Sequence, residues 1–290
     1  MSESNNPEDL KDNPSEVVPA DAINNGGNQS EPEKSDNEEE TNETEELGSV
    51  QISEEDKDAF ELDFQHCKIP KLENLEVLTQ IETLGFRWNF IKKIENLQTL
   101  TTLQELELYD NQITKMENLE CLVNLRVLDI SHNKLRKIEG LETLTNLKKL
   151  FLVSNKISKI ENLENCTQLE MLELGDNKIR KLENLEHLTN LTELFVGKNK
   201  IVQIENLDLL TSLRLLSIQS NRIREITGLD RLTSLEELYI ADNGLTNLKG
   251  LENQNLQTLE IANNKVSDIS GEDNTENTNE SNERYQYLQV

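Results

Sequence analysis

Residues 147–168 read LKKLFLVSNKISKIENLENCTQ, and much of the chain between Asp63 and Gly271 repeats this pattern. Counted from the leading leucine, Leu147, positions one, four and six hold leucine and position nine holds Asn155. The leading leucine recurs every 22 residues, at Leu103, Leu125, Leu147, Leu169, Leu191, Leu213 and Leu235. A constant repeat of this length predicts a stack of similar units, each of which buries its apolar side against its neighbours.

The first half of each repeat has the alternation of a short strand. Positions three, five and seven hold Lys149, Phe151 and Val153 between the leucines, so one face is expected to point inward. From position eleven the apolar residues recur at every third residue, which is the period of a 3₁₀ helix. An asparagine at position nine predicts a ladder of bonds to the backbone of its own and the next turn. The equivalents of Asn155 are Asn89, Asn111, Asn133, Asn177, Asn199, Asn221, Asn243 and Asn264.

Position sixteen is occupied only by asparagine or glycine. Its residues are Asn74, Asn96, Asn118, Gly140, Asn162, Asn184, Asn206, Gly228, Gly250 and Gly271. These are the two residue types that best tolerate a positive φ angle. We therefore predict a left-handed residue at this position in every repeat.

Together these features are typical of a leucine-rich repeat. The predicted fold is an α/β solenoid of about ten 22-residue repeats, with a parallel concave sheet and 3₁₀-type convex turns. We divide the chain into an acidic disordered leader (1–56), a leucine-rich repeat domain (57–271) and a polar disordered tail (272–290). The spacing of Ser53 and Asp56 is that of a capping box, which predicts a short helix through Phe60 that covers the first repeat.

Charge and composition exclude several kinds of partner. The chain has 290 residues and a net charge of −27, and residues 1–58 hold 19 acidic residues against three lysines. Nucleic acid is therefore a poor partner. The N-terminus has no basic and apolar signal segment, and no apolar run is long enough for a membrane helix. Cys67, Cys121 and Cys166 show no metal or redox spacing, and Cys166 is expected to be buried.

No catalytic motif stands out, so we expect a non-catalytic protein without a cofactor or metal. The three histidines, His66, His132 and His187, are scattered across distant repeats. The chain has neither a nucleophile elbow nor a glycine-rich phosphate loop. The function is therefore expected to lie on a surface.

Position five forms the outward-facing column of the predicted sheet, in which acids alternate with aromatic residues. The column reads Asp63, Gly85, Glu107, Asp129, Phe151, Glu173, Phe195, Ser217, Tyr239 and Glu260. Aromatic residues among acids are typical of an interface with a basic protein, in which the rings anchor and the acids orient the partner. The alternative is a solvated face with incidental aromatics. Trp88 and Tyr109 would widen the patch. We select Glu107, Asp129, Phe151, Glu173, Phe195, Tyr239 and Glu260 as partner-binding residues.

Three segments carry a family resemblance. Residues 155–201, NKISKIENLENCTQLEMLELGDNKIRKLENLEHLTNLTELFVGKNKI, closely resemble the protein phosphatase 1 regulatory subunit 7 family, the leucine-rich-repeat subunits of that phosphatase. LYDNQITKMENLE (108–120) and LDISHNKLRKIEGLE (128–142) do so as well. The likeness covers about residues 60 to 270, and the repeated I-E-N-L makes it specific.

The resemblance implies a nuclear and cytoplasmic protein that binds the phosphatase catalytic subunit through its concave face, and a monomer outside that complex. The family contacts map onto Asp129, Phe151, Glu173 and Phe195, with Glu260 where the family tends to have aspartate. The chain has no [RK]-x-[VI]-x-[FW] docking string, so binding would use the folded surface. The family continues for about two more repeats and a capping segment, which this chain lacks.

Two other functions are compatible with the sequence. The first is an acidic leucine-rich nuclear adaptor that binds basic proteins such as histones through its charge, which the acidic leader favours. Charge-driven binding is expected to collapse at high salt, whereas an interface anchored by aromatic rings is expected to persist. The second rival is an enzyme whose site carries no known motif.

Overall fold

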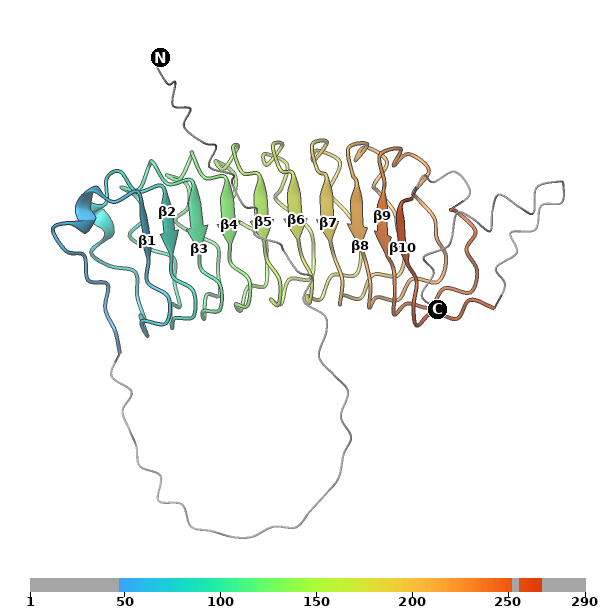
Figure 1. The fold of residues 1–290 in the computed structure, drawn as a ribbon, viewed down its shortest axis with the longest axis horizontal. Helices are drawn as coiled ribbons and strands as arrows, with labels where there is room; N and C mark the ends of the chain where they lie inside the picture. Colours follow the sequence, from blue (N-terminus) through green and yellow to red (C-terminus); the bar gives the residue numbers. More distant parts are fainter. Residues whose placement is uncertain (1–46, 252–255, 268–290) are drawn as a thin grey trace, which may run out of the picture. The chain divides into compact units, whose positions relative to one another are not determined.

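The computed structural model describes residues 47–251 and 256–267. Residues 1–46 of the predicted leader, the predicted tail and Gly271 lie outside these ranges. Ten three-residue strands form a single parallel sheet in chain order (Figure 1). The strands are β1 (Glu61–Asp63), β2 (Thr83–Gly85), β3 (Glu105–Glu107), β4 (Val127–Asp129), β5 (Lys149–Phe151), β6 (Met171–Glu173), β7 (Glu193–Phe195), β8 (Leu215–Ser217), β9 (Glu237–Tyr239) and β10 (Thr258–Glu260). The predicted solenoid with a parallel sheet is therefore confirmed.

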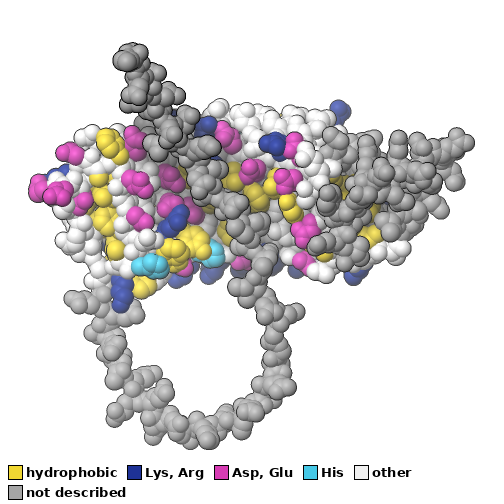
Figure 2. All heavy atoms as spheres, viewed as in Figure 1, with side chains coloured by type: hydrophobic (Ala, Val, Ile, Leu, Met, Phe, Trp, Pro, Cys, Tyr) yellow, Lys and Arg dark blue, Asp and Glu magenta, His cyan; other side chains and the backbone are white. Residues whose placement is uncertain are grey.

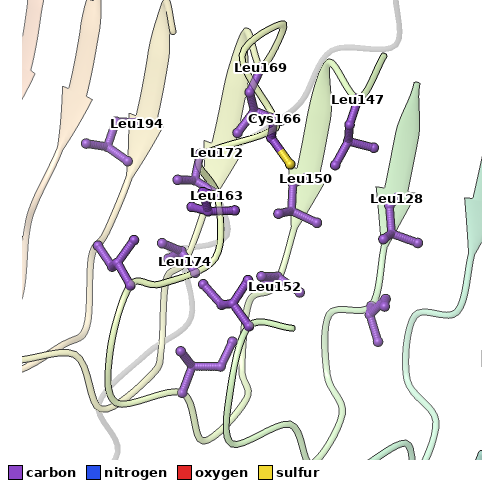
Figure 3. Packing of buried hydrophobic residues seen from close by; sticks show 14 of the residues in the cluster. Leu128, Leu147, Leu150, Leu152, Leu163, Cys166, Leu169, Leu172, Leu174 and Leu194 are labelled. Atoms are coloured by element: carbon purple, nitrogen blue, oxygen red, sulfur yellow. The ribbon is translucent and has the colours of Figure 1, made fainter. Parts of the chain in front are cut away.

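Each strand covers positions three to five of its repeat, and the pairing joins equivalent positions. Leu150 of β5 is aligned with Leu172 of β6, which is aligned with Leu194 of β7. All three leucines are fully buried, and Leu147, Leu152, Leu169 and Leu174, at positions one and six of the first two of these repeats, lie around them (Figure 3). The core is therefore a continuous stack of leucine and isoleucine, because each repeat buries its apolar side against the next.

The position-nine asparagines form the predicted ladder of bonds to the backbone. Asn155 donates through Nδ2 to the carbonyl oxygens of Leu152 at 3.2 Å and Ile130 at 3.0 Å, and its Oδ1 accepts the Leu135 N–H at 2.9 Å. Ile130 and Leu135 belong to the preceding repeat. The expected bond to the next turn was therefore wrong in direction, because the side chain reaches back along the stack.

Position sixteen is left-handed in all nine repeats that the described residues cover, as predicted. The asparagines there have φ near 60°, as at Asn162, and Gly140 has φ 74°. The side chain also makes a second ladder, since Asn162 Nδ2 donates to the Ile138 carbonyl oxygen at 2.6 Å. Where glycine replaces asparagine, a Cβ on Gly140 would lie 2.8 Å from the Met116 carbonyl oxygen, so the turns approach more closely.

The outer side of the repeats has the predicted 3₁₀-type hydrogen bonds but few assigned helices. The Leu100 N–H donates to the Leu97 carbonyl oxygen at 3.0 Å, and Leu103 repeats this with Leu100 at 3.1 Å. Among the described residues only two segments count as 3₁₀ helices, η1 (Asp56–Asp58) and η2 (Leu75–Val77). No helix in these ranges is long and apolar enough to cross a membrane. Cys166 is buried at position twenty, as expected, and burial raises the pKa of its thiol to about 11.

The N-terminal end of the stack is covered by residues that the sequence assigns to the leader. Val50 is buried in the core, and its carbonyl oxygen accepts a bond from Asn74 Nδ2 at 3.2 Å. Ser53 and Asp56 make the reciprocal bonds of a capping box, at 2.9 Å from the Ser53 N–H to Asp56 Oδ2 and at 3.3 Å from the Asp56 N–H to Ser53 Oγ, although the N-cap of the helix is Glu55. Its helix was predicted too long, since η1 ends at Asp58, buries no residue and leaves Phe60 exposed. The apolar cover comes from Val50 instead.

Candidate functional site

The strand pairing brings the position-five residues into one unbroken column. Glu107 is aligned with Asp129, Asp129 with Phe151, and so on through Glu173, Phe195 and Ser217 to Tyr239 and Glu260. All seven residues selected from the sequence therefore lie on the same face of the sheet. The column is interrupted at two strands, because Gly85 and Ser217 are buried.

The two phenylalanines are half-buried neighbours of acids rather than members of the core. Phe151 lies between Asp129 and Glu173 in the register, and Phe195 lies between Glu173 and Ser217. Both rings and both acids belong to strands with the same pattern, in which the middle residue is buried and the last is half-buried. Each ring therefore presents part of its surface on the strand face beside a carboxyl group.

The acids in the centre of the column are poorly solvated. Burial raises the pKa of Glu173 to about 7, and the charge of Asp129 adds to the shift. Burial also raises the pKa of Asp129, against a hydrogen bond of 2.8 Å from the Ser131 N–H to its Oδ1 that favours the charged form. A desolvated carboxylate gains more from a cationic partner than a solvated one does. The column is therefore suited to a basic partner that restores the lost solvation.

Glu107 at the N-terminal end of this group is already paired. The Arg87 guanidinium, at position seven of the preceding repeat, forms an ion pair and a hydrogen bond with the Glu107 carboxylate. Burial nevertheless raises the pKa of Glu107, with Arg87 opposing the shift. Arg87 thus reaches an acid of the column from position seven of the preceding repeat.

Tyr239 and Glu260 occupy the far end of the column. The Tyr239 hydroxyl donates to Glu237 Oε2 at 2.8 Å, and burial followed by this bond raises the pKa of the phenol to about 12. The ring is half-buried, whereas Glu260 on the last strand is exposed. Ser217 separates these two residues from Phe195, so the column has a central group of five and a smaller C-terminal group.

Position eight is left-handed in every repeat, which the sequence did not predict. Trp88 has φ 55° and His132 has φ 53°, although bulky residues rarely adopt this conformation. The turn projects these side chains beside the ends of the strands. Aspartate, asparagine and histidine, which tolerate positive φ, are frequent at this position, but tryptophan, serine and lysine also occur, so the signal is weaker than at position sixteen.

An aromatic row extends from the first repeat to the fourth. His66 stacks on Trp88 with ring centroids 4.5 Å apart, Trp88 meets Tyr109 edge-on at 5.6 Å, and Tyr109 lies 4.7 Å from His132. Figure 2 shows histidine beside a patch of hydrophobic side chains near the ends of β2–β4. His66 and His132 lie in the first and fourth repeats, as the sequence indicates, and form the two ends of this row with Trp88 and Tyr109 between them. That Trp88 and Tyr109 widen the position-five patch stays a prediction.

Metal ligands do not gather on the described part of the chain. Within residues 47–251 and 256–267, no group of three or more histidine, cysteine, aspartate or glutamate side chains is arranged to hold a metal ion. The column offers a surface of half-buried rings and desolvated carboxylates.

Replacement of Glu173 by glutamine should change the pH dependence of stability. The pKa of Glu173 is raised from 4.5 to about 7, so its protonated form is favoured by the fold. The folded state binds more protons than the unfolded state between these values, so stability is present below pH 4.5 and is lost as the pH rises through 7. Relative to Glu173→Gln, the parent chain should lose on the order of 2 kcal/mol between pH 4 and pH 8. Urea unfolding across this range measures it, and parallel curves would contradict it.

Comparisons with known proteins agree on the repeat. Family models described as leucine-rich repeat match residues 150–247 and 252–272, and a model described as two copies of the leucine-rich repeat matches residues 101–143 and 123–165. No curated protein matches the chain by sequence. Together the family matches cover the strands from β3 to β10.

Two solved structures illustrate the similarity of fold. A leucine-rich-repeat protein of Leptospira interrogans is 25% identical, with a TM-score of 0.55 over 66% of this chain and 57% of that one. Internalin C2 of Listeria monocytogenes is also 25% identical, with a TM-score of 0.55 over 69% of this chain and 80% of that one. This chain thus spans little more than half the length of the Leptospira protein.

Proposed function

Because this chain is a leucine-rich repeat protein, a fold suited to protein–protein binding, we propose that it is a non-catalytic regulatory subunit of protein phosphatase 1. In this proposal it binds the catalytic subunit through the strand face, in the nucleus and the cytoplasm, and is a monomer outside the complex. The observation that supports it is the column itself. Half-buried Phe151 and Phe195 alternate with desolvated Asp129 and Glu173, and these four match the positions of the family resemblance.

The roles of the column residues follow from their surroundings. Phe151 and Phe195 act as anchors, because an aromatic side chain that is already half-buried loses little conformational freedom when a partner covers it. Asp129 and Glu173 orient basic groups of the partner. Glu107 contributes less, because Arg87 already satisfies it. Tyr239 and Glu260 add a second, smaller contact.

The direct test is calorimetry of the purified phosphatase catalytic subunit with the full chain. We expect binding that Phe151→Ala/Phe195→Ala weakens by about 30-fold, which corresponds to about 2 kcal/mol. The matched control is Val123→Ala/Leu209→Ala, which removes two exposed apolar side chains outside the strands and should leave binding unchanged. Circular dichroism checks that the variants are folded. Absence of binding by the parent chain, or equal loss in both double variants, would overturn the proposal.

The acidic leader supports a second candidate, an acidic leucine-rich nuclear adaptor for histones. Residues 1–58 contribute 19 acidic residues against three lysines, which suits a strongly basic partner. The same calorimetry at low and at high salt separates the two candidates. Histone binding that collapses with salt and ignores the phenylalanines would favour the adaptor, whereas phosphatase binding that survives high salt favours the regulatory subunit.

A further inference from the structure

The turns that follow β7–β10 enclose a hollow whose charged side chains are all positive. It has a volume of about 510 Å³, and its side chains come from four consecutive repeats. The lining residues are Val202, Asn221, Arg222, Arg224, Asn243, Gly244 and Lys265. Three cations and no acid surround this space in a chain whose net charge is −27. The hollow is therefore locally positive, whereas the chain as a whole is strongly negative.

A second hollow of similar size, built by positions thirteen to nineteen of the sixth and seventh repeats, has a different set of charges. It has a volume of about 470 Å³ and is lined by one cation, Lys181, and three acids, Glu183, Glu186 and Asp208. Its charged side chains are negative on balance, and Lys181 pairs with Glu205 at 3.8 Å. The first hollow therefore differs from the second both in charge and in the positions of the repeat that build it.

The cations of the first hollow have no partner among the described residues. No side-chain hydrogen bond or ion pair within residues 47–251 and 256–267 involves Arg222, Arg224 or Lys265, and all three are exposed. Elsewhere position thirteen pairs with position fifteen, as in Lys115 and Glu117 at 3.1 Å. In the eighth repeat these positions hold Glu225 and Thr227, so the usual position-fifteen carboxylate is absent.

The space itself comes from two small residues at positions that carry long cations in other repeats. Val202 stands at position twelve, where the fourth repeat has Arg136, and Gly244 stands at position ten, where the sixth has Lys178. A Cβ on Gly244 would lie 3.3 Å from the Ile223 carbonyl oxygen and 3.5 Å from Arg224 Cγ. A longer side chain at this position would therefore lie directly beside Arg224 and take up space in the hollow.

We propose that this hollow binds the phosphoryl group of a phosphorylated peptide. A phosphate dianion has three terminal oxygens, so two guanidinium groups and one ammonium group can all be satisfied by it. A single carboxylate has two oxygens and one charge, and it would leave part of this set unpaired. Val202, which is 60% exposed, supplies an apolar wall for the residue beside the phosphorylated side chain. Recognition of phosphorylated segments by arginine clusters follows the same chemistry.

This site is independent of the proposed phosphatase interface. Its residues occupy positions nine to twelve, beyond the strands, whereas the partner-binding column occupies position five. A peptide held there would leave Phe151 and Phe195 accessible to a different partner. Failure of one site therefore says nothing about the other, because each is tested with its own probe and its own variants.

The test is fluorescence polarisation of the full chain with a fluorescein-labelled Gly-Ala-phosphoserine-Ala-Gly peptide. We expect saturable binding that Arg224→Gln and Lys265→Gln each weaken by about tenfold, because each removes a charge-assisted bond. The matched control is Lys181→Gln in the neighbouring hollow, which should bind as the parent does. All three residues are exposed, so folding should be unaffected.

Two control peptides, with serine or glutamate in place of phosphoserine, and one variant of the chain complete the test. The serine peptide should not bind, and the glutamate peptide should bind at least about tenfold more weakly than the phosphoserine peptide. Equal binding by the glutamate peptide would overturn the proposal in favour of a site for acidic segments. The measurement is repeated with Glu38, Glu39, Glu40, Glu43, Glu45 and Glu46 changed to glutamine, which lowers the negative charge of the N-terminal segment. No phosphoserine-specific binding in either chain would also overturn it.

Discussion

Leu172→Ala should destabilise the chain by about 3 kcal/mol, within the 2–5 kcal/mol of such changes in buried cores. Leu172 is fully buried in β6, between Leu150 and Leu194 of the adjoining strands. Removal of its side chain leaves a cavity that two repeats must share, because the backbone bonds of both neighbours hold the strands at their spacing. Urea unfolding followed by circular dichroism measures the change.

The matched control for this substitution is Leu209→Ala. Leu209 has the same side chain but is 56% exposed, so its removal should change stability by less than about 0.5 kcal/mol. A mid-stack lesion can also uncouple the two halves of a solenoid, which would appear as a second unfolding step. A loss below about 1 kcal/mol with Leu172→Ala would show that the stack relaxes around the missing side chain.

Asn155→Leu should cost about 3 kcal/mol, because it removes an internal hydrogen-bonding group and leaves its backbone partners unsatisfied. Leucine has nearly the shape of asparagine, so packing is disturbed less than hydrogen bonding. The Leu135 N–H loses its acceptor at 2.9 Å, and the carbonyl oxygens of Ile130, Leu152 and Val153 lose a donor. Unfolding in urea and amide hydrogen exchange at Leu135 measure the effect.

Asn165→Leu is the control for the ladder. Asn165 is exposed and makes one bond, from Nδ2 to the Glu142 carbonyl oxygen at 3.0 Å. Its replacement should cost less than about 1 kcal/mol, because water can satisfy the released carbonyl. Equal destabilisation by the two asparagine variants would mean that the position-nine ladder contributes no more than a surface bond.

The repeat made much of this fold predictable, because each feature appears many times. Asn162 and its equivalents were recognised as left-handed from ten occurrences of asparagine or glycine at one position, and the φ angles agree at all nine described. Position eight is equally left-handed but was missed at Trp88 and His132, because its residue types vary. A backbone conformation can be predicted from the sequence only where it restricts which residue types occupy the position.

The candidate site divides in the same way. The alternation of position five predicted that Phe151, Glu173 and Phe195 share one face, since a strand alternates its side chains and equivalent strands pair in register. The raised pKa of Glu173 had no signal in the sequence, because desolvation depends on what surrounds the carboxyl group. The ion pair between Arg87 and Glu107 was also missed, since it joins position seven of one repeat to position five of the next.

The sequence by itself therefore determined the architecture, the residues of the core and the face on which the column lies. These follow from the periodicity of the sequence. The same pattern recurs in each repeat, and stacking of the repeats brings equivalent positions into contact. Only the tertiary structure decided which position-five acids are desolvated, that His66 and His132 belong to one aromatic row, and that Arg222, Arg224 and Lys265 surround one hollow. Those properties depend on distances between side chains of different repeats, and distance is set by how the turns stack rather than by spacing along the chain.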